Sequence, residues 1–204
     1  MSERKSEYTM KVASISIKSQ GLSRQRMFDL FFSTIGVIMF SPFYLLAIIA
    51  IFIEDRGSPF FKQDRIGQYR IPFLIIKFRT MNNGKVTKVG KWLRSTGLDE
   101  TAQFLNVLKG DMSMIGPRPL TKDDIDRLGW NDFHYDKRWS VKPGVSGLSQ
   151  MLAGKSAIYS WKIDQLYMKK KSFSLDVRLL FLSLLINIFG KRRIRNLFLT
   201  GSNK

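Results

Sequence analysis

The sequence predicts an α+β fold that is mostly helical, with one small β-hairpin. Three observations lead to this prediction. The 24 residues 30–53 carry no charged side chain, which is typical of one long apolar helix. Aromatic and β-branched residues at 59–61 and 73–78 flank a connection that contains glycine, a pattern that favours a hairpin. Helical patterns then return at 89–94 and 104–108 and in the C-terminal part of the chain.

The apolar run is long enough to cross a bilayer, but Ser41-Pro42 interrupts it near its middle. Proline removes a backbone donor and clashes with the preceding turn, so we expect a kink or a break. A kinked helix could span the membrane, whereas a break could return the chain to the same face. Basic residues flank the run at 18–26 and at 56–70, which weakly favours a re-entrant helix with both ends in the cytoplasm.

The chain divides into three predicted parts. They are an N-terminal tail (1–22), the apolar helix-break-helix (23–56) and a cytoplasmic domain that would carry any catalytic site (57–204). In the third part, the basic and aromatic segment 161–171 and the apolar segment 175–189 predict amphipathic helices. With the basic cluster 191–195 they suit the headgroup region of an anionic phospholipid membrane. A core helix with a solvated basic tail is the alternative.

Composition limits the kinds of site. The net charge is +18, from 34 basic and 16 acidic side chains, and it implies an anionic partner: nucleic acid, an anionic membrane or a phosphorylated substrate. Cysteine is absent, which excludes disulfides and a thiolate nucleophile. His134 is the single histidine, has no partner at ligand spacing, and is interpreted as a surface residue. Any chemistry must therefore come from carboxylates, Lys or Arg side chains, hydroxyls or a bound ion.

The stretch 98–119, LDETAQFLNVLKGDMSMIGPRP, is the most informative part of the sequence. It places Asp99 and Glu100 before an amphipathic helix with apolar residues 104, 105 and 108 on one face, which Gly110 ends. Neighbouring helical residues point about 100° apart, so one carboxylate could be a nucleophile or metal ligand while the other has a separate role. A helix N-terminus favours an ionised Asp99 and a nearby phosphate. Alternatively, Asp99 simply belongs to a cap that begins at Thr96.

Four cations near this pair in the sequence are candidates for phosphate binding. Lys77 and Arg79 alternate with Phe78 on a predicted strand, so both point to one face. Arg94 lies just before the acidic pair, and Arg118 lies between two prolines that restrict its backbone. The planar fork of arginine suits bidentate phosphate binding. Taken singly, each cation could equally be a surface salt-bridge partner.

Three further acids are candidates for metal ligation or ribose contact: Asp111, Asp164 and Asp176. Asp111 could equally be a turn residue, and Asp176 could cap the last helix. The turn signal at 82–84 is interpreted as the end of the hairpin, and 141–147 as a tight loop.

These motifs resemble those of the bacterial sugar transferase family, the small monotopic phosphoglycosyl transferases. The likeness covers nearly all of 24–190 and consists of separate motifs in the same order. They are the basic collar and apolar helix with Ser41-Pro42, FKQDRIG at 61–67, KFRTM at 77–81, LRSTGLDE at 93–100, NVLKGDMSMIGPRP at 106–119 and VKPGVSGLSQ at 141–150. The chain departs from the family pattern at Ala102, where the family usually has proline.

The resemblance implies a reaction. A sugar 1-phosphate would move from a nucleoside-diphosphate sugar, usually a UDP-sugar, to polyprenol phosphate, with release of UMP. Asp99 would be the nucleophile of a covalent ping-pong mechanism, Arg94 and Arg118 would contact phosphate, and Glu100 would assist. Mg²⁺ would be the cofactor, held by Asp99 with or without Glu100. The family's broken helix is re-entrant, which implies a monotopic protein on the cytoplasmic face of the bacterial inner membrane.

Two other functions are weighed against this one. The first is a non-catalytic scaffold that binds anionic lipid through its basic surface. The second is a nucleic-acid-binding module. The uncharged 24-residue stretch and the lack of a recognisable reader motif argue against it, so no nucleic-acid partner is expected.

Overall fold

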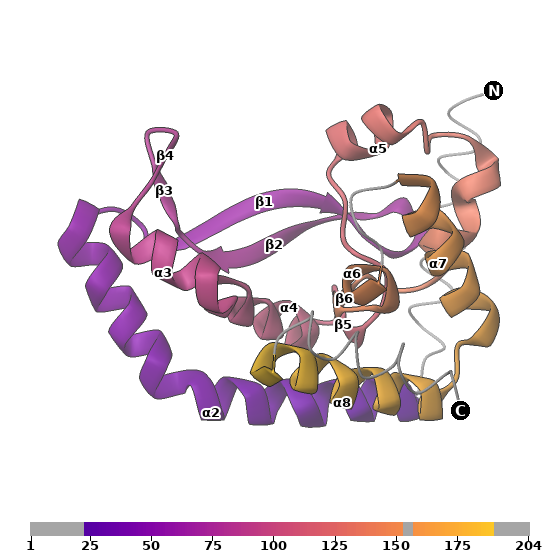
Figure 1. The fold of residues 1–204 in the computed structure, drawn as a ribbon, viewed down its shortest axis with the longest axis horizontal. Helices are drawn as coiled ribbons and strands as arrows, with labels where there is room; N and C mark the ends of the chain where they lie inside the picture. Colours follow the sequence, from indigo (N-terminus) through magenta and orange to yellow (C-terminus); the bar gives the residue numbers. More distant parts are fainter. Residues whose placement is uncertain (1–22, 153–156, 190–204) are drawn as a thin grey trace.

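The computed structural model describes residues 23–152 and 157–189. The fold is α+β and mostly helical, as predicted (Figure 1). The predicted tail 1–22 and the basic cluster 191–195 lie outside the described residues. In chain order the elements, with η for a 3-10 helix, are α2 (Arg24–Asp55), β1 (Phe60–Ile66), η1 (Gln68–Arg70), β2 (Pro72–Phe78), β3 (Met81–Asn82), β4 (Lys85–Val86), α3 (Lys88–Thr96), η2 (Leu98–Gln103), α4 (Phe104–Lys109), β5 (Ser113–Ile115), α5 (Lys122–Leu128), η3 (Phe133–Ser140), β6 (Gly144–Ser146), α6 (Leu148–Leu152), α7 (Ala157–Lys170) and α8 (Phe173–Phe189).

The apolar run forms α2, which continues through Pro42 as one helix of 32 residues. Figure 1 shows a sharp bend in the middle part of this helix, with one arm along α8 and the other rising to α3. Pro42 has no N–H to donate to the carbonyl of Ile38, and the hydroxyl of Ser41 donates to that carbonyl instead, at 2.8 Å. Of the predicted kink or break, the structure has the kink, and the Ser41 hydroxyl satisfies the acceptor that Pro42 leaves without a donor.

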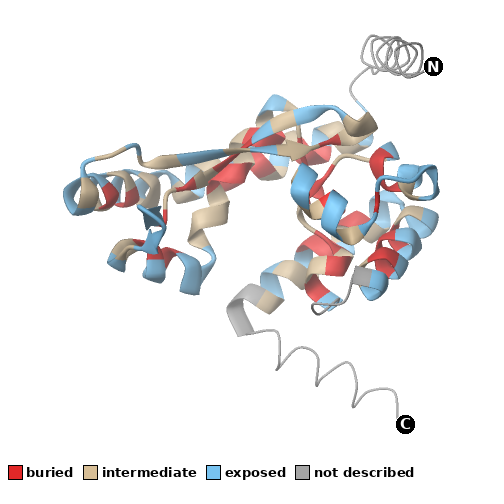
Figure 2. Ribbon diagram, turned by 90° about the horizontal axis from the view of Figure 1, so that it is seen from above, coloured by how far each residue is buried: buried red, intermediate tan, exposed pale blue. Residues whose placement is uncertain are grey.

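The two arms of α2 belong to two different cores. The first arm buries Phe28 in a cluster with side chains of β2, α4, β5, α7 and α8. The second arm buries Ala47 and Ile51 against β2, α3 and η2. Ala102, at the position of the family proline, is fully buried in this second cluster. Figure 2 shows the buried segments beside the hairpin and among the C-terminal helices.

The predicted hairpin is the antiparallel pair β1 and β2, which runs from Phe60 opposite Phe78 to Ile66 opposite Pro72. The turn at Asn83-Gly84 was predicted to end this hairpin, and that prediction is wrong. The turn joins β3 to β4 in a second hairpin. Both turn residues have positive φ, 47° and 77°, which is the requirement of a tight two-residue hairpin turn.

The acidic pair lies in η2, which follows α3 directly and continues into α4. The predicted cap at Thr96 is wrong. Gly97, at φ 71°, ends α3, and the Thr96 hydroxyl donates back to the carbonyl of Trp92 at 3.0 Å instead of accepting from η2. Gly110 ends α4 at φ 97°, as predicted. The predicted apolar face is only half-buried, because α4 buries its opposite residues, Asn106 and Val107, more deeply.

The segment 141–147 is more than a tight loop, because it contains strand β6, which pairs in parallel with β5. The two segments approach so closely that a Cβ on Gly144 would lie 2.0 Å from the backbone nitrogen of Gly116, and one on Gly147 would lie 2.0 Å from the Gly116 carbonyl oxygen. Only glycine allows this contact. It fixes the Gly-Pro-Arg-Pro turn that carries Arg118.

The C-terminal helices α7 and α8 complete the first core. Helix α8 buries Leu179 and Leu180 and leaves Leu184 and Leu185 exposed. It lies along the first arm of α2, where the rings of Phe173 and Phe28 are 5.6 Å apart (Figure 1). The buried side of α8 is that of a core helix. Its exposed leucines are compatible with the predicted position at the membrane surface, which stays a proposal.

Candidate active site

A cavity of about 580 Å³ opens between the hairpin, α3 and η2. Five of the predicted site residues line it: Lys77, Arg79, Arg94, Asp99 and Glu100. The sixth, Arg118, lines a small cleft that adjoins the cavity at Arg65, Lys77 and Glu100. Residues from separate segments of the chain therefore meet around the acidic pair. Ser41 and Pro42 do not line this cavity.

The two carboxylates have different surroundings. The ammonium of Lys77 donates to Glu100 Oε1 at 2.5 Å, whereas Asp99 forms no salt bridge with any residue that the structure describes. Burial raises the pKa of the Asp99 carboxyl, and the negative charge of Glu100 raises it further. The charges of Lys77 and Arg94 oppose this rise. Asp99 thus presents an unpaired carboxylate to the cavity, and Glu100 is held in place.

The cations around the pair are positioned by neighbouring elements. Arg79 forms an ion pair with Asp55, the last residue of α2, and Arg94 donates from Nε to the Thr80 hydroxyl at 2.8 Å. The guanidinium of Arg79 lies over Gly57, where any side chain would collide with it. The end of the apolar helix therefore helps to place a cation of the cavity.

Arg118 is exposed at the cleft, and its backbone carbonyl is hydrogen-bonded by the buried side chain of Arg138. Arg138 donates to the carbonyl of Arg118 at 2.6 Å and pairs with Asp164 at 2.9 Å. Both side chains of this pair are only 3% exposed. The sequence suggested Asp164 as a metal or ribose ligand, but Asp164 is not available for that role because it neutralises a buried arginine.

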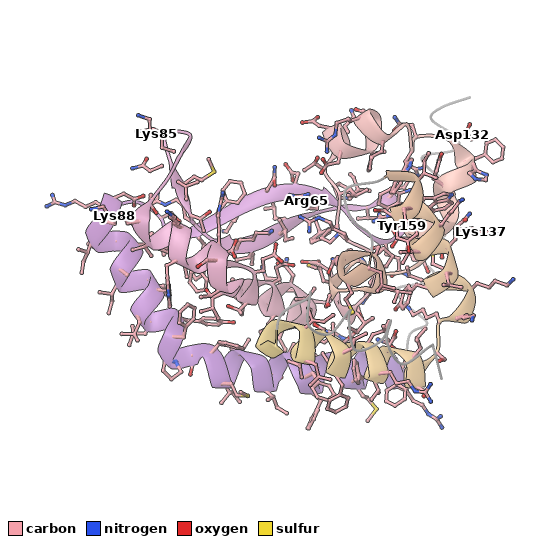
Figure 3. All side chains as sticks on the ribbon, in the orientation of Figure 1. Arg65, Lys85, Lys88, Asp132, Lys137 and Tyr159 are labelled. Atoms are coloured by element: carbon pink, nitrogen blue, oxygen red, sulfur yellow. The ribbon has the colours of Figure 1, made fainter. Side chains whose placement is uncertain are left out.

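Arg65 is a residue of this site that the sequence interpretation missed (Figure 3). Its guanidinium contacts the carbonyl of Pro119 at 3.2 Å and Asp124 at 3.4 Å, and its buried Nε has no hydrogen-bond partner. Burial lowers the pKa of Arg65, and the nearby charge of Arg118 lowers it as well. The hairpin pattern could have found it, since Arg65 lies on the same face of β1 as Phe61, the cross-strand partner of Lys77.

The apolar helix also contacts the segment that carries the acidic pair. The hydroxyl of Tyr44 donates to the carbonyl of Thr101 at 2.9 Å, next to Glu100. Arg26 donates to the carbonyls of Val107 and Leu108 at 2.6 and 2.7 Å, at the end of α4. The first arm of α2 therefore contacts the C-terminal end of α4, and the second arm contacts η2.

The remaining candidates lie away from the cavity. Asp111 accepts a hydrogen bond from Asn106 at 3.3 Å, in the turn after α4. Asp176 is fully buried and accepts from the hydroxyl of Tyr167 at 2.8 Å, while Ser172 caps α8. His134 is exposed. None of them joins the acidic pair.

The donor set of the acidic pair suits Mg²⁺ only together with a substrate phosphate. The described residues contain no group of three acids or histidines that could hold a metal alone. Mg²⁺ keeps several waters and is typically bound by one or two carboxylates together with substrate phosphates. Asp99 and Glu100 supply two carboxylates at a cavity lined by cations, so a metal carried by a diphosphate fits this donor set.

Comparison with known proteins identifies the family. The bacterial sugar transferase family model matches residues 21–190. The chain belongs to the bacterial sugar transferase family. It is 34% identical, over 82% of its length, to a UDP-N-acetylgalactosamine-undecaprenyl-phosphate N-acetylgalactosaminephosphotransferase of Aeromonas hydrophila, of which it covers 45%. It is 37% identical, over 63% of its length, to a UDP-glucose:undecaprenyl-phosphate glucose-1-phosphate transferase of Caulobacter vibrioides, of which it covers 53%.

A third relative is the sugar transferase EpsL of Bacillus subtilis, 38% identical over 78% of this chain and covered for 84% of its own length. The chain thus spans about half the length of the first two relatives and most of the third. The matched segment includes α2, the hairpin, the acidic pair and the turn with Arg118.

Proposed function

We propose that this protein transfers a sugar 1-phosphate from a UDP-sugar to polyprenol phosphate and releases UMP, as the first membrane step of glycan assembly. The names of the Aeromonas and Caulobacter relatives both contain undecaprenyl phosphate and a UDP-sugar, but the sugars differ. We therefore propose the class of donor, a UDP-sugar, and not a particular sugar. The observation that carries it is the unpaired Asp99 in a cavity lined by Lys77, Arg79 and Arg94.

The proposed reaction has two steps. An oxygen of Asp99 attacks the β-phosphorus of the UDP-sugar. The bond to the bridging oxygen breaks, and UMP leaves with the electron pair. An oxygen of the lipid phosphate then attacks the same phosphorus and displaces the Asp99 carboxylate. Each step exchanges one phosphorus–oxygen bond for another, so no proton transfer is required and the carboxylate is regenerated.

The side chains around Asp99 support this chemistry. The cationic walls of the cavity favour two polyanionic substrates and the charge that develops on the departing UMP. Lys77 fixes Glu100 beside Asp99. We propose that Asp99 and Glu100 bind Mg²⁺ together with the diphosphate, where the ion would neutralise phosphate charge. Arg65 and Arg118, in the adjoining cleft, are proposed to hold a phosphate of the substrate.

We further propose a monotopic arrangement on the cytoplasmic membrane face, with α2 as a re-entrant helix. Among the described residues, α2 is the one helix long and apolar enough to cross a membrane by length and composition. Its bend and the exposed apolar side chains on both arms, including Phe31, Met39 and Ile53, support insertion without crossing. The chain lacks cysteine, so single cysteines at Ser23 and Ser58 can report the side of each end. Labelling from opposite sides would contradict the re-entrant arrangement.

Purified protein with Mg²⁺, polyprenol phosphate and a panel of UDP-sugars tests the reaction by UMP release. We expect Asp99→Asn to abolish release while the variant keeps the wild-type melting temperature. Wild-type turnover in Asp99→Asn would exclude the covalent mechanism. Wild-type protein that binds anionic vesicles but releases no UMP from any donor would support the membrane scaffold instead.

A further inference from the structure

A second cavity, of about 280 Å³, lies on the other side of η2. Gly97 and Glu100 line both this cavity and the larger one that contains Asp99. The acidic segment therefore forms a wall between two spaces, and only the larger space is lined by Lys77, Arg79 and Arg94.

The second cavity has a mixed lining, in which Glu100 is the one charged residue among those that the structure describes and uncharged polar residues such as Ser146 and Ser183 lie among apolar ones. Glu100 and Gln150 line both this cavity and the small cleft of Arg65 and Arg118. Its apolar walls come from α4, β5 and α8 and include Phe104, Leu180 and Leu184. We call this second cavity the α8 groove. It adjoins the site of the cations, and no Lys or Arg among the described residues lines it.

The α8 groove reaches the apolar helix. Phe104, one of its walls, packs against Gly36, and its ring centroid is 6.1 Å from that of Phe40. Leu184 is 47% exposed on α8, which lies along the first arm of α2 (Figure 1). An apolar chain that follows the groove from Glu100 would thus emerge among exposed apolar side chains.

We infer that the α8 groove binds the first isoprenoid units of the lipid acceptor, separately from the cavity that takes the nucleotide sugar. This inference rests on the proposed function. In polyprenol phosphate the chain is joined through one ester oxygen to the phosphate that attacks, so its first carbons must lie within a few bonds of the phosphorus held by Asp99. The groove begins at Glu100, beside Asp99, and among the lining residues on α4 and α8 it has Phe104, Leu180 and Leu184. In a phospholipid a glycerol unit separates the phosphate from the acyl chains, which fits this arrangement less well.

The matched substitutions Leu184→Trp and Leu185→Trp test this assignment. The two leucines are neighbours on α8 and are 47% and 43% exposed, but only Leu184 lines the groove. Each variant is first charged with a labelled UDP-sugar in the absence of acceptor, and the UMP released measures the amount of competent enzyme. Polyprenol phosphate in detergent micelles is then added, and transfer of the label to lipid is timed.

We expect kcat/KM for polyprenol phosphate to fall at least tenfold in Leu184→Trp and to stay within twofold of wild type in Leu185→Trp. Equal transfer by the two charged variants would overturn the groove assignment alone. Absence of UMP release from wild-type protein would instead contradict the proposed function.

A binding readout keeps the inference testable without turnover. In Asp99→Asn, a prenyl phosphate with a photoreactive group on its chain should cross-link to peptides of α4 or α8, and excess polyprenol phosphate should suppress this. Cross-links confined to the hairpin or α3 would overturn the assignment.

Discussion

Replacing Asp164 with leucine should destabilise the protein strongly, because the guanidinium of Arg138 would remain buried without its carboxylate. The two groups are 2.9 Å apart and each side chain is 3% exposed. Arg138 lies between the rings of Trp130 and Trp139, 5.4 and 5.0 Å from their centroids, so it cannot turn easily to solvent. Removing one partner of a buried ion pair costs about 3–5 kcal/mol.

For a chain of this size that loss corresponds to a fall in melting temperature of roughly 6–20 °C. Intrinsic fluorescence is a suitable probe, since Trp130, Trp139 and Trp161 belong to one buried cluster around the pair. The double variant Arg138→Met, Asp164→Leu is the matched control. It removes both charges, and we expect it to recover most of the stability. A fall of less than about 2 °C in Asp164→Leu would refute the reasoning, as it would mean that Arg138 finds water or another partner.

Three further predictions concern the acidic pair and α2. UMP release in the first step should decline as pH falls through the pKa of Asp99, because only the ionised carboxylate attacks. Removing the charge that raises this pKa, in Glu100→Gln, should move the acidic limb of the pH–rate profile to lower pH, and an unmoved limb would contradict this. The Ile38 carbonyl is exposed on the protein surface, and in the bilayer that we propose around α2 it meets no water. Ser41→Ala leaves it without a donor there and should cost about 1–3 kcal/mol, read as a lower melting temperature in lipid nanodiscs; no change would mean that another donor replaces the hydroxyl. Tyr44→Phe removes the hydrogen bond to Thr101 and should cost about 0.5–1.5 kcal/mol, with a lower kcat for UMP release; an unchanged kcat would show that this contact does not position η2.

Features that depend on local sequence could be predicted well. The hairpin follows from the aromatic and β-branched residues on both sides of a connection that contains glycine, and the bend of α2 follows from Pro42. Lys77 and the acidic pair belong to two motifs of the family resemblance, 77–81 and 93–100, so their grouping in one site could be expected. The end of α4 at Gly110 needs only the backbone freedom of glycine.

Features that depend on distant contacts could not be predicted. Thr96 looked like a cap because its spacing from Asp99 fits one, but the left-handed Gly97 between them ends α3 first. Strand β6 has no signal of its own, since its three residues pair only because glycines allow 113–116 and 143–147 to touch. The hairpin pattern could place Arg65 on the face of β1 that meets Lys77, but its proximity to Arg118 depends on the folded chain.

The most direct test of the account is to trap the covalent intermediate. Wild-type protein is mixed with a labelled UDP-sugar in the absence of polyprenol phosphate, quenched, and digested for peptide mass spectrometry. We predict one UMP released per competent enzyme and one phosphosugar attached to Asp99. UMP released with no adduct, or with the adduct on Glu100, would contradict the assignment of Asp99 as the nucleophile.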